Sequence, residues 1–359
     1  MKIFFQSILD FIFPIECVGC GDELRAHNLS QDRNYWLCDY CFSKIEFNKK
    51  QICPLCGREI KIGYSCVCAA GIEVGLEGIE WKDGEEYNNI SNQKFKIKNL
   101  KSWVDVYITF VDLKKNPQVA RLIHKLKYEF VEGAAADLAK IGIKFLDKIC
   151  KFADGYSGGL EISNLLFGGD VIWAPIPLHK KRLLWRGFNQ SELILREIEK
   201  RIREEYKESR QYSEKLEIEN LKFAIRTDIL IRKKNTRFQG KSKMAENDRR
   251  ENMRGAFEAR RCGAISNVNP ASSAGQILKK FQISLPAPIL RQAVKFQFFK
   301  KNCVKNDHKA GVRDEHFFKD KTVILFDDVI TAGATMEECA RVLKEAGAMR
   351  VIAMAVGKG

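Results

Sequence analysis

The sequence lacks any uninterrupted apolar run long enough to cross a membrane. A spanning helix needs about 20 apolar residues, and the apolar beginning of the chain, MKIFFQSILDFIFPIEC, is shorter than that. It also lacks the small-residue cleavage site of a signal peptide, because Pro14 and a cysteine pair follow the apolar stretch. We therefore expect a cytoplasmic protein with no membrane span, whose first residues form a short amphipathic helix docked on the rest.

Acidic residues are scarce relative to basic ones. Asp and Glu number 46 against 61 Lys and Arg, which gives a net charge of +15. This excess favours an anionic partner, either nucleic acid or a polyphosphate. The basic residues are spread along the chain, so a generally basic surface explains the same composition. Histidine is scarce too, and Cys303, His308 and His316 are too scattered to predict a metal site.

Cysteine is abundant only near the beginning, where eight of the 12 precede residue 70. These eight form four close pairs: Cys17 and Cys20, Cys38 and Cys41, Cys53 and Cys56, Cys66 and Cys68. Close pairs of this kind indicate metal thiolates in a reducing compartment rather than disulfides. Four thiolates form one closed tetrahedral zinc site, so eight can form two structural sites with no open catalytic position.

Two pairings of these cysteines agree with the sequence. Sequential pairing joins the first two pairs into one site and the last two pairs into another, and interleaved pairing is the alternative. Gly19, Gly21 and Gly57 lie beside the pairs and allow the tight turns in which backbone N–H groups approach the sulfurs. The region is too short to build its own core, so bound metal would supply much of its folding free energy.

Strand and helix patterns alternate through the rest of the chain. Short apolar runs predict strands at 171–174, 229–231, 322–326 and 351–356, and residues 103–111 also have strand character. Helical spacing predicts helices at 117–127, 134–152, 191–206 and 336–346. This alternation is typical of an α/β fold with a mainly parallel sheet.

The most informative stretch is 323–335, which has the sequence VILFDDVITAGAT. Four apolar residues predict a buried strand, Asp327 and Asp328 follow, and a turn of small residues then leads into a helix. Small residues that open a helix leave backbone N–H groups free to hold a phosphate, and the helix dipole favours the anion. Together these features predict a site for a phosphorylated sugar.

This stretch resembles the motif of type I phosphoribosyltransferases that binds phosphoribosyl pyrophosphate (PRPP). The resemblance implies that Asp327 and Asp328 hold the ribose hydroxyls, accompanied by Mg²⁺. It also implies that the turn wraps the 5-phosphate through Thr331, Ala332, Gly333, Ala334 and Thr335. Ala332 departs from the family, whose members usually carry Thr or Ser there, so one hydroxyl contact is lost while the backbone nest remains.

A second motif, PIPLHKKRLLWRGFNQSE, follows the strand at 171–174. A basic loop at the carboxyl end of a parallel strand is where an α/β sheet binds its ligand. The stretch resembles the signature of the ComF family of late-competence proteins, as do IFPIECVGCG, CPLCG, LIHKLKYEF and MRGAF, in the family's order. By this resemblance Pro177, Leu178, His179 and Lys180 form the pyrophosphate-side loop, and Arg186, Asn189 and Gln190 line the site.

The ComF resemblance implies a domain order. We expect a double zinc ribbon at 1–72, a linker or insertion at 73–102, and a type I phosphoribosyltransferase-like domain at 103–359. A basic insertion at about 259–319 departs from the family. The implied role is in natural competence, where the protein would handle single-stranded DNA beside a helicase-like partner protein. An active phosphoribosyltransferase with an unidentified acceptor and a zinc-ribbon interaction scaffold with a relic PRPP site are the alternatives.

Three basic segments have more than one interpretation. Lys125 and Lys127 either meet phosphate or are solvated lysines at a helix end. Residues 232–254 either form a lid over PRPP, whose Thr-x-x-Gln element matches Thr236 and Gln239, or contact DNA, or form an exposed basic helix. In the insertion, Phe296, Phe298 and Phe299 lie among lysines and either stack on bases of single-stranded nucleic acid or pack internally.

Overall fold

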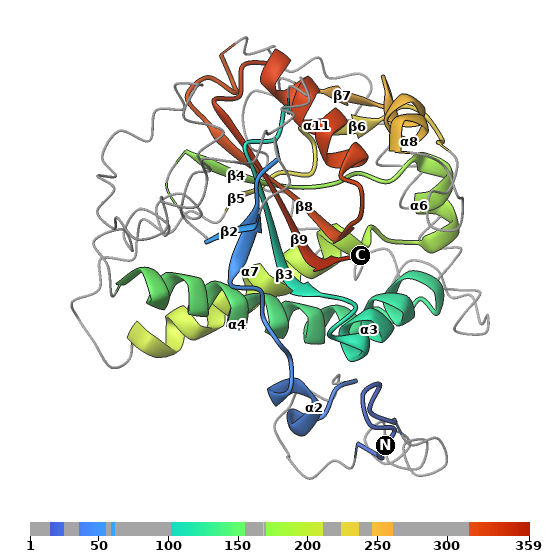
Figure 1. Cartoon of the computed structure of the whole chain (residues 1–359), viewed down its shortest axis with the longest axis vertical. Helices are drawn as coiled ribbons and strands as arrows, with labels where there is room; N and C mark the ends of the chain where they lie inside the picture. The colour runs from blue at the N-terminus through green and yellow to red at the C-terminus, as the bar shows by residue number, and fades with distance from the viewer. Residues whose placement is uncertain are drawn as a thin grey trace, which may run out of the picture.

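The computed structural model describes residues 15–24, 36–54, 59–61, 102–154, 168, 170–210, 224–236, 246–260 and 316–359. At its centre lies a seven-stranded sheet with the order β2-β1-β3-β9-β8-β4-β5 (Figure 1). The strands are β1 (Lys50–Ile52), β2 (Glu59–Lys61), β3 (Val106–Asp112), β4 (Val171–Pro175), β5 (Ala224–Ile225), β8 (Thr322–Ile330) and β9 (Arg350–Lys358). From β3 to β5 all neighbours are parallel, whereas β1 pairs antiparallel with both β2 and β3. The expected mainly parallel α/β fold is therefore confirmed.

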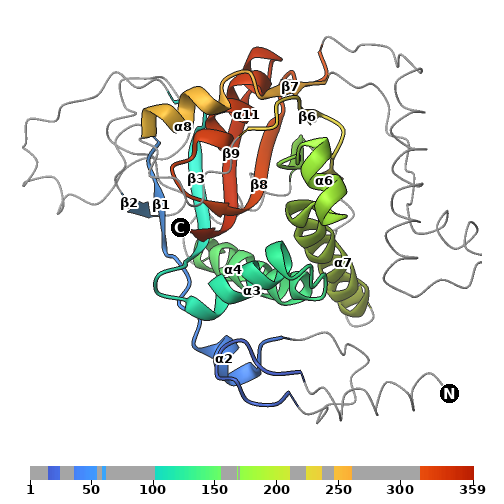
Figure 2. The same cartoon turned by 90° about the vertical axis from the view of Figure 1, so that its right-hand side faces the viewer.

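Helices cover both faces of this sheet, which explains why its central strands are nearly continuous apolar runs. One face packs on α3 (Pro117–Tyr128), α4 (Ala134–Asp154) and α7 (Gln190–Arg210), and the other on α11 (Ala334–Glu345) (Figure 2). Side chains of β8 alternate between the two cores: Ile324 and Phe326 belong to the first, and Val323 and Leu325 to the second. All four are fully buried.

A smaller layer lies on α11, on the side away from the sheet. It contains α8 (Glu246–Met253) and a two-stranded antiparallel sheet of β6 (Leu230–Arg232) and β7 (Phe257–Ala259). Its apolar residues Leu230, Met253 and Phe257 share a core with α11. The strand expected at 229–231 exists, but its place in the parallel sheet was wrong, since β6 pairs only with β7 among the described strands.

The N-terminal module packs against the helices of the first face and also extends the sheet. Its single described helix, α2 (Asp39–Ser43), lies below α3 and α4 in Figure 1. The backbone N–H of Trp36 donates to Asp137 Oδ2 at 2.7 Å, and Arg121 Nη1 donates to the carbonyl oxygen of Val18 at 2.6 Å. Burial raises the pKa of the Asp137 carboxyl to about 7, although the hydrogen bond from the Trp36 N–H acts in the opposite direction.

The helices predicted from residues 117, 134, 191 and 336 are present, although α11 begins two residues earlier, at Ala334. The basic loop predicted after β4 is partly a helix, α6 (Lys180–Arg186). No helix among the described residues is long and apolar enough to span a membrane. The helix expected at the start of the chain, most of the expected linker at 73–102, residues 237–245 of the expected lid and nearly all of the expected insertion at 259–319 lie outside the described residues.

Candidate functional site

The two carboxylates of the sugar-phosphate motif lie within β8, near its carboxyl end, because the strand continues to Ile330. Asp328 is 2% exposed and its Oδ2 lies 2.8 Å from the ammonium of Lys127 on α3. Burial opposes the charge on Lys127, but the neighbouring Asp328 and Asp327 outweigh it and raise the lysine's pKa. Lys127 is thus a partly buried partner of the motif and not a solvated lysine at a helix end, whereas its contact with phosphate stays a prediction.

Lys125, which precedes it on the same helix, behaves differently. Its ammonium pairs with Glu129 Oε2 at 2.9 Å and lies 4.7 Å from the centre of the Trp36 ring. Lys125 therefore links α3 to the N-terminal module.

Asp327 is the more accessible of the two acids. Its Oδ1 accepts hydrogen bonds from Ser191 Oγ at 2.7 Å and from the backbone N–H of Asp328 at 2.9 Å. Burial and the negative charge of Asp328 raise the pKa of Asp327 to about 7, although Lys127 and Ser191 act in the opposite direction. Asp327 therefore changes its charge near neutral pH, whereas Asp328 is paired with the ammonium of Lys127.

The small-residue turn forms the open N-terminus of α11. Gly333 is the N-cap residue, with φ of 74°, and no side chain caps this helix. The first backbone N–H groups of a helix have no partner within it, so those of Ala334, Thr335 and Met336 are available to an anion. Thr331 is exposed and Thr335 partly exposed, which leaves hydroxyl groups beside the same turn.

The turn rests on a tyrosine and a glutamate that sequence reasoning missed. A Cβ atom on Gly333 would lie 2.9 Å from the hydroxyl oxygen of Tyr107 in β3. That hydroxyl donates to Glu337 Oε1 at 2.8 Å, and Glu337 also accepts from Ser102 Oγ and the backbone N–H of Trp103. Only the position of Glu337 in the first turn of a helix hinted at a role, since acids are favoured there.

Among the expected pyrophosphate-side and site-lining residues, Arg186 lies close enough to Asp327 and Asp328 for their charges to act on its pKa. Pro177, Leu178 and His179 form the loop after β4, and Lys180 begins α6. Arg186 Nη1 donates to Gln190 Oε1, and Arg186 Nε is buried without a hydrogen-bond partner among the described residues. Asn189 donates to the carbonyl oxygen of Ile176 and accepts from the N–H of Ser191, so it fixes the loop against the start of α7.

Thr236 joins α6 to the small layer. Arg182 Nη2 donates to its carbonyl oxygen and Arg232 Nη2 to its hydroxyl oxygen, both at 2.6 Å. The Nε of Arg232 is buried and has no hydrogen-bond partner in the described part of the chain. Gln239, the other member of the expected lid element, lies outside the described residues.

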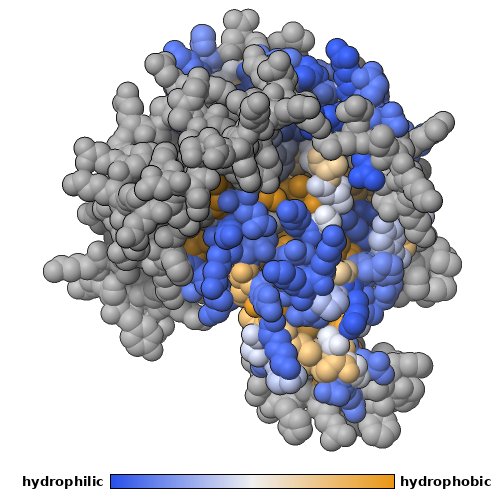
Figure 3. Space-filling view, in the orientation of Figure 1, coloured by the Kyte–Doolittle hydropathy of each residue, from blue (hydrophilic) through white to orange (hydrophobic). Residues whose placement is uncertain are grey.

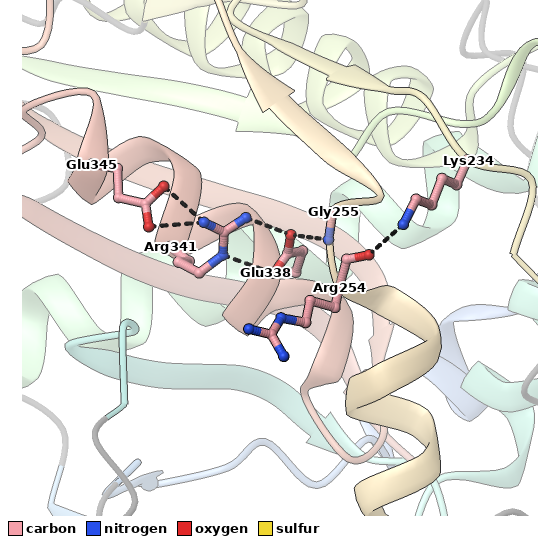
Figure 4. A network of polar contacts seen from close by, with 6 residues as sticks. All are labelled: Lys234, Arg254, Gly255, Glu338, Arg341 and Glu345. Carbon is pink, nitrogen blue, oxygen red and sulfur yellow. Dashed lines mark hydrogen bonds and ion pairs between the residues drawn. The ribbon is translucent and has the colours of Figure 1, made fainter.

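A polar network fixes this layer on α11 (Figure 4). Glu338 Oε1 accepts from the backbone N–H of Gly255 at 2.6 Å and from Arg341 Nη2 at 2.7 Å. Arg341 also donates to both carboxylate oxygens of Glu345, and Lys234 Nζ donates to the carbonyl oxygen of Arg254. The helix that begins at the anion nest therefore also holds the small layer.

Four cysteines of the N-terminal module form a candidate metal site. The sulfurs of Cys17, Cys20, Cys38 and Cys41 all lie within 4.8 Å of one another, and those of Cys20 and Cys38 are 3.8 Å apart. Tetrahedral zinc with Zn–S bonds of about 2.3 Å spaces its sulfurs about 3.8 Å apart. This is the first quartet of the sequential pairing, and its donors fit a structural zinc ion.

The surrounding backbone supports that site. N–H groups of Gly19 and Cys38 donate to the Cys17 sulfur at 3.4 and 3.3 Å. Burial opposes ionisation of Cys17, but backbone hydrogen bonds from Cys38, Cys20 and Gly19 lower its pKa to about 6. A Cβ on Gly19 would lie 2.6 Å from the Cys41 sulfur, so the knuckle requires glycine.

In the second expected site Cys53 is buried, whereas Cys56, Cys66 and Cys68 lie outside the described residues.

Two stretches of the chain match known protein-domain families. Residues 8–70 match the double zinc ribbon domain, and residues 271–358 match the phosphoribosyl transferase domain. The chain carries a phosphoribosyltransferase domain. The matched stretch of that domain contains β8, α11 and β9, and hence the acid pair and the anion nest. No curated protein sequence matches the chain.

Proposed function

We propose that the protein binds PRPP through β8 and the N-terminus of α11. The observation that carries this proposal is the continuity of the acid pair with an uncapped helix N-terminus, in a domain similar to phosphoribosyl transferases. The 5-phosphate would occupy the nest of Thr331, Ala332, Gly333, Ala334 and Thr335. Backbone N–H groups and the helix dipole together favour a phosphate there.

The two acids would have unequal roles. Asp327 is partly exposed and would accept hydrogen bonds from the ribose hydroxyls. Asp328 is buried on Lys127 and would position that lysine and the strand rather than contact the sugar. This division modifies the expectation that both acids hold the ribose.

The diphosphate would extend toward the loop of Pro177, Leu178, His179 and Lys180, with Arg186 and Gln190 beside it. Mg²⁺ is commonly held by one or two carboxylates together with substrate phosphates. Asp327 is the acid available for it, since Asp328 is already paired. The ion would neutralise negative charge on the pyrophosphate group. The buried, unpartnered Nε of Arg186 provides a further donor near this side.

Two activities are compatible with PRPP binding. In a ComF-like role, which the sequence resemblance supports, the protein would act in the cytoplasm during natural competence. It would handle single-stranded DNA beside a helicase-like partner, with PRPP as an effector. In a transferase role, an acceptor nitrogen would replace pyrophosphate at carbon 1 of the ribose through an oxocarbenium-like transition state. A third role, as a zinc-ribbon scaffold, would leave the PRPP site without function.

Calorimetric titration of the zinc-loaded full chain with PRPP and Mg²⁺ tests the proposal. We expect saturable binding that Asp327→Asn weakens at least about tenfold, since a hydrogen bond to a charged group contributes about 1.5–3 kcal/mol. Glu132→Gln, a change to a carboxylate elsewhere in the chain, is the control. Absence of PRPP binding by the unaltered protein would reject the proposal. Release of pyrophosphate with an added nucleobase would separate the transferase role from the effector role.

A further inference from the structure

Exposed aromatic side chains gather at the end of α3 and on α6. Among the described residues six large apolar side chains are exposed, and four of them come from these two segments: Tyr128, Phe130, Leu184 and Trp185. Trp185 is the most exposed, at 64%. On the face in Figure 3 the described surface is mainly hydrophilic, with apolar atoms visible in several places between the hydrophilic ones. Such clustering of apolar groups indicates an interaction surface.

The two rings at the centre of this aromatic patch form a pair. The Phe130 and Trp185 rings have their centroids 5.0 Å apart and meet edge to face at 78°. Phe130 has φ of 57°, a left-handed conformation that is uncommon for a bulky residue. The backbone thus holds an exposed ring in an unfavourable conformation. Strain of this kind is typical of functional positions.

The helix that carries Trp185 contributes nothing to the core. Among the residues of α6 none is buried. The helix is held through Arg182, which donates to Thr236, and through Arg186, which donates to Gln190. A helix fixed by its polar side chains keeps its apolar side chains available to a partner.

The same helix is strongly basic. Lys180, Lys181, Arg182 and Arg186 make up four of its seven residues, and it has no acid. Lys180 and Lys181 are both exposed beside Leu184 and Trp185. Protein interfaces are depleted in lysine at their centre, and a seven-residue helix is short for a membrane-surface anchor. A surface that combines exposed aromatic rings with cations instead fits a ligand that carries both negative charges and flat apolar groups.

We propose that α6 and the end of α3 bind single-stranded nucleic acid. Phe130 and Trp185 would stack on unpaired bases, and Lys180 and Lys181 would contact the phosphates. In a duplex the base faces are already stacked, so the surface favours single strands. Lys127 and Arg186, from the same two segments, reach toward Asp328. A bound strand would therefore pass beside the proposed PRPP site. The inference rests on the proposed DNA-handling role and is independent of PRPP binding.

Fluorescence anisotropy of a labelled 20-nucleotide oligothymidine with the zinc-loaded full chain tests this surface. We expect the double variant Phe130→Ala, Trp185→Ala to bind at least about tenfold more weakly, because stacking on each base contributes substantially to affinity. Trp185→Phe should retain most of the binding. Lys181→Gln should reduce the slope of log K against log salt by about 0.7.

The matched control is Tyr40→Ala, which removes an equally exposed aromatic ring beside Lys44 in α2. An equal loss in this control, or unchanged binding by the double variant, would overturn the assignment to α6. If the unaltered protein bound no single-stranded DNA, both this inference and the proposed DNA-handling role would be rejected. Preferential binding to a 20-base-pair duplex or to vesicles of anionic phospholipid would also overturn the inference. PRPP titration of each variant shows separately whether the sugar-phosphate site is intact.

Discussion

At the scale of single residues, the candidate site depends on how two adjacent negative charges are balanced. Asp328 has a dedicated cation, whereas Asp327 has a hydroxyl and a backbone N–H. The two acids therefore differ in their partners although they are neighbours in sequence. This difference leads to two predictions, one for each acid.

Asp327→Asn should stabilise the ligand-free protein as well as weaken PRPP binding. In the native state the pKa of Asp327 is about 7 against an ordinary value of 3.8, so the folded protein holds a proton that the unfolded chain releases. The stability of the native protein therefore falls as pH rises from about 4 to 7. Asparagine removes this effect and can still accept from Ser191. We expect a gain of at least about 1 kcal/mol at pH 8, shrinking toward pH 4, in thermal melts. A pH-independent difference would contradict the assigned pKa.

Lys127→Met should be strongly destabilising, by about 3–5 kcal/mol in urea unfolding, because it leaves Asp328 buried without a cation. The double variant Lys127→Met, Asp328→Asn should recover most of that loss. Lys125→Met is the control, since its partner Glu129 is 45% exposed and such pairs contribute at most about 1 kcal/mol. Equal effects of the two lysine substitutions would argue against a special role for Lys127.

The sequence was sufficient to identify the adjacent acids and the small-residue turn before a helix, but not the residues that these contact. The run DDVITAGAT carries its chemistry within consecutive residues, so local pattern reveals it. Lys127 and Asp328 are 201 positions apart, and Tyr107 and Glu337 are 230 positions apart. Pairing over such separations is decided by which strands become neighbours, and no local spacing records it.

At the scale of elements, the N-terminus of α11 depends on glycine at one position. Gly333→Ala adds a Cβ 2.9 Å from the Tyr107 hydroxyl and also strains a backbone with φ of 74°. Gly347→Ala is the matched control, because its φ is 107° and nothing lies within 4 Å of the added atom. Both should lose about 1 kcal/mol of stability from backbone strain. Only Gly333→Ala should also weaken PRPP binding in calorimetry, by about tenfold or more, because it displaces the turn that would hold the phosphate. An equal effect of both substitutions on binding would argue against a role for the contact with Tyr107.

The small layer offers a second prediction at this scale. Glu338→Gln should loosen α8 and β7, because a neutral amide pairs less well with Arg341 and holds the N–H of Gly255 less strongly. We expect faster amide hydrogen exchange in residues 246–260. Glu345→Gln also weakens a pair with Arg341, but the Glu345 carboxylate is 52% exposed and its partner lies on the same helix, α11. Similar exchange in both variants would show that Glu338 is not the anchor.

Element prediction succeeded where periodicity was strong and failed where packing decides. The apolar spacing of α3 and α11 identified them directly. In α6 the prolines before it and its basic residues suggested a loop, because a helix without a buried face shows no apolar period. Residues 229–231 indicated a strand, which the structure has at Leu230–Arg232, but whether it joins the main sheet or pairs with β7 depends on tertiary packing.

At the scale of the whole molecule, the zinc module and the phosphoribosyltransferase domain share one core. Cys17, Leu37 and Ile45 pack in the same cluster as Phe110 and Phe145. Removal of zinc by a chelator should therefore lower the melting temperature of the entire chain, rather than unfold the module alone. Differential scanning calorimetry of zinc-loaded and chelated protein measures this change. Chelation should lower the melting temperature of the Cys41→Ser variant less than that of the unaltered protein. An unfolding transition of the main domain at the same temperature with and without chelator would contradict the shared core.

The attachment of β1 to β3 has a consequence for any shortened form of the protein. Asn48 N–H donates to the carbonyl oxygen of Phe110, and Ile52 pairs with Tyr107. A chain that began at residue 102 would expose the free edge of β3, a row of unpaired backbone donors and acceptors beside buried apolar residues. Open edges of this kind recruit further strands from other molecules. The N-terminal module thus protects the sheet from self-association, and its loss should be detected first as aggregation.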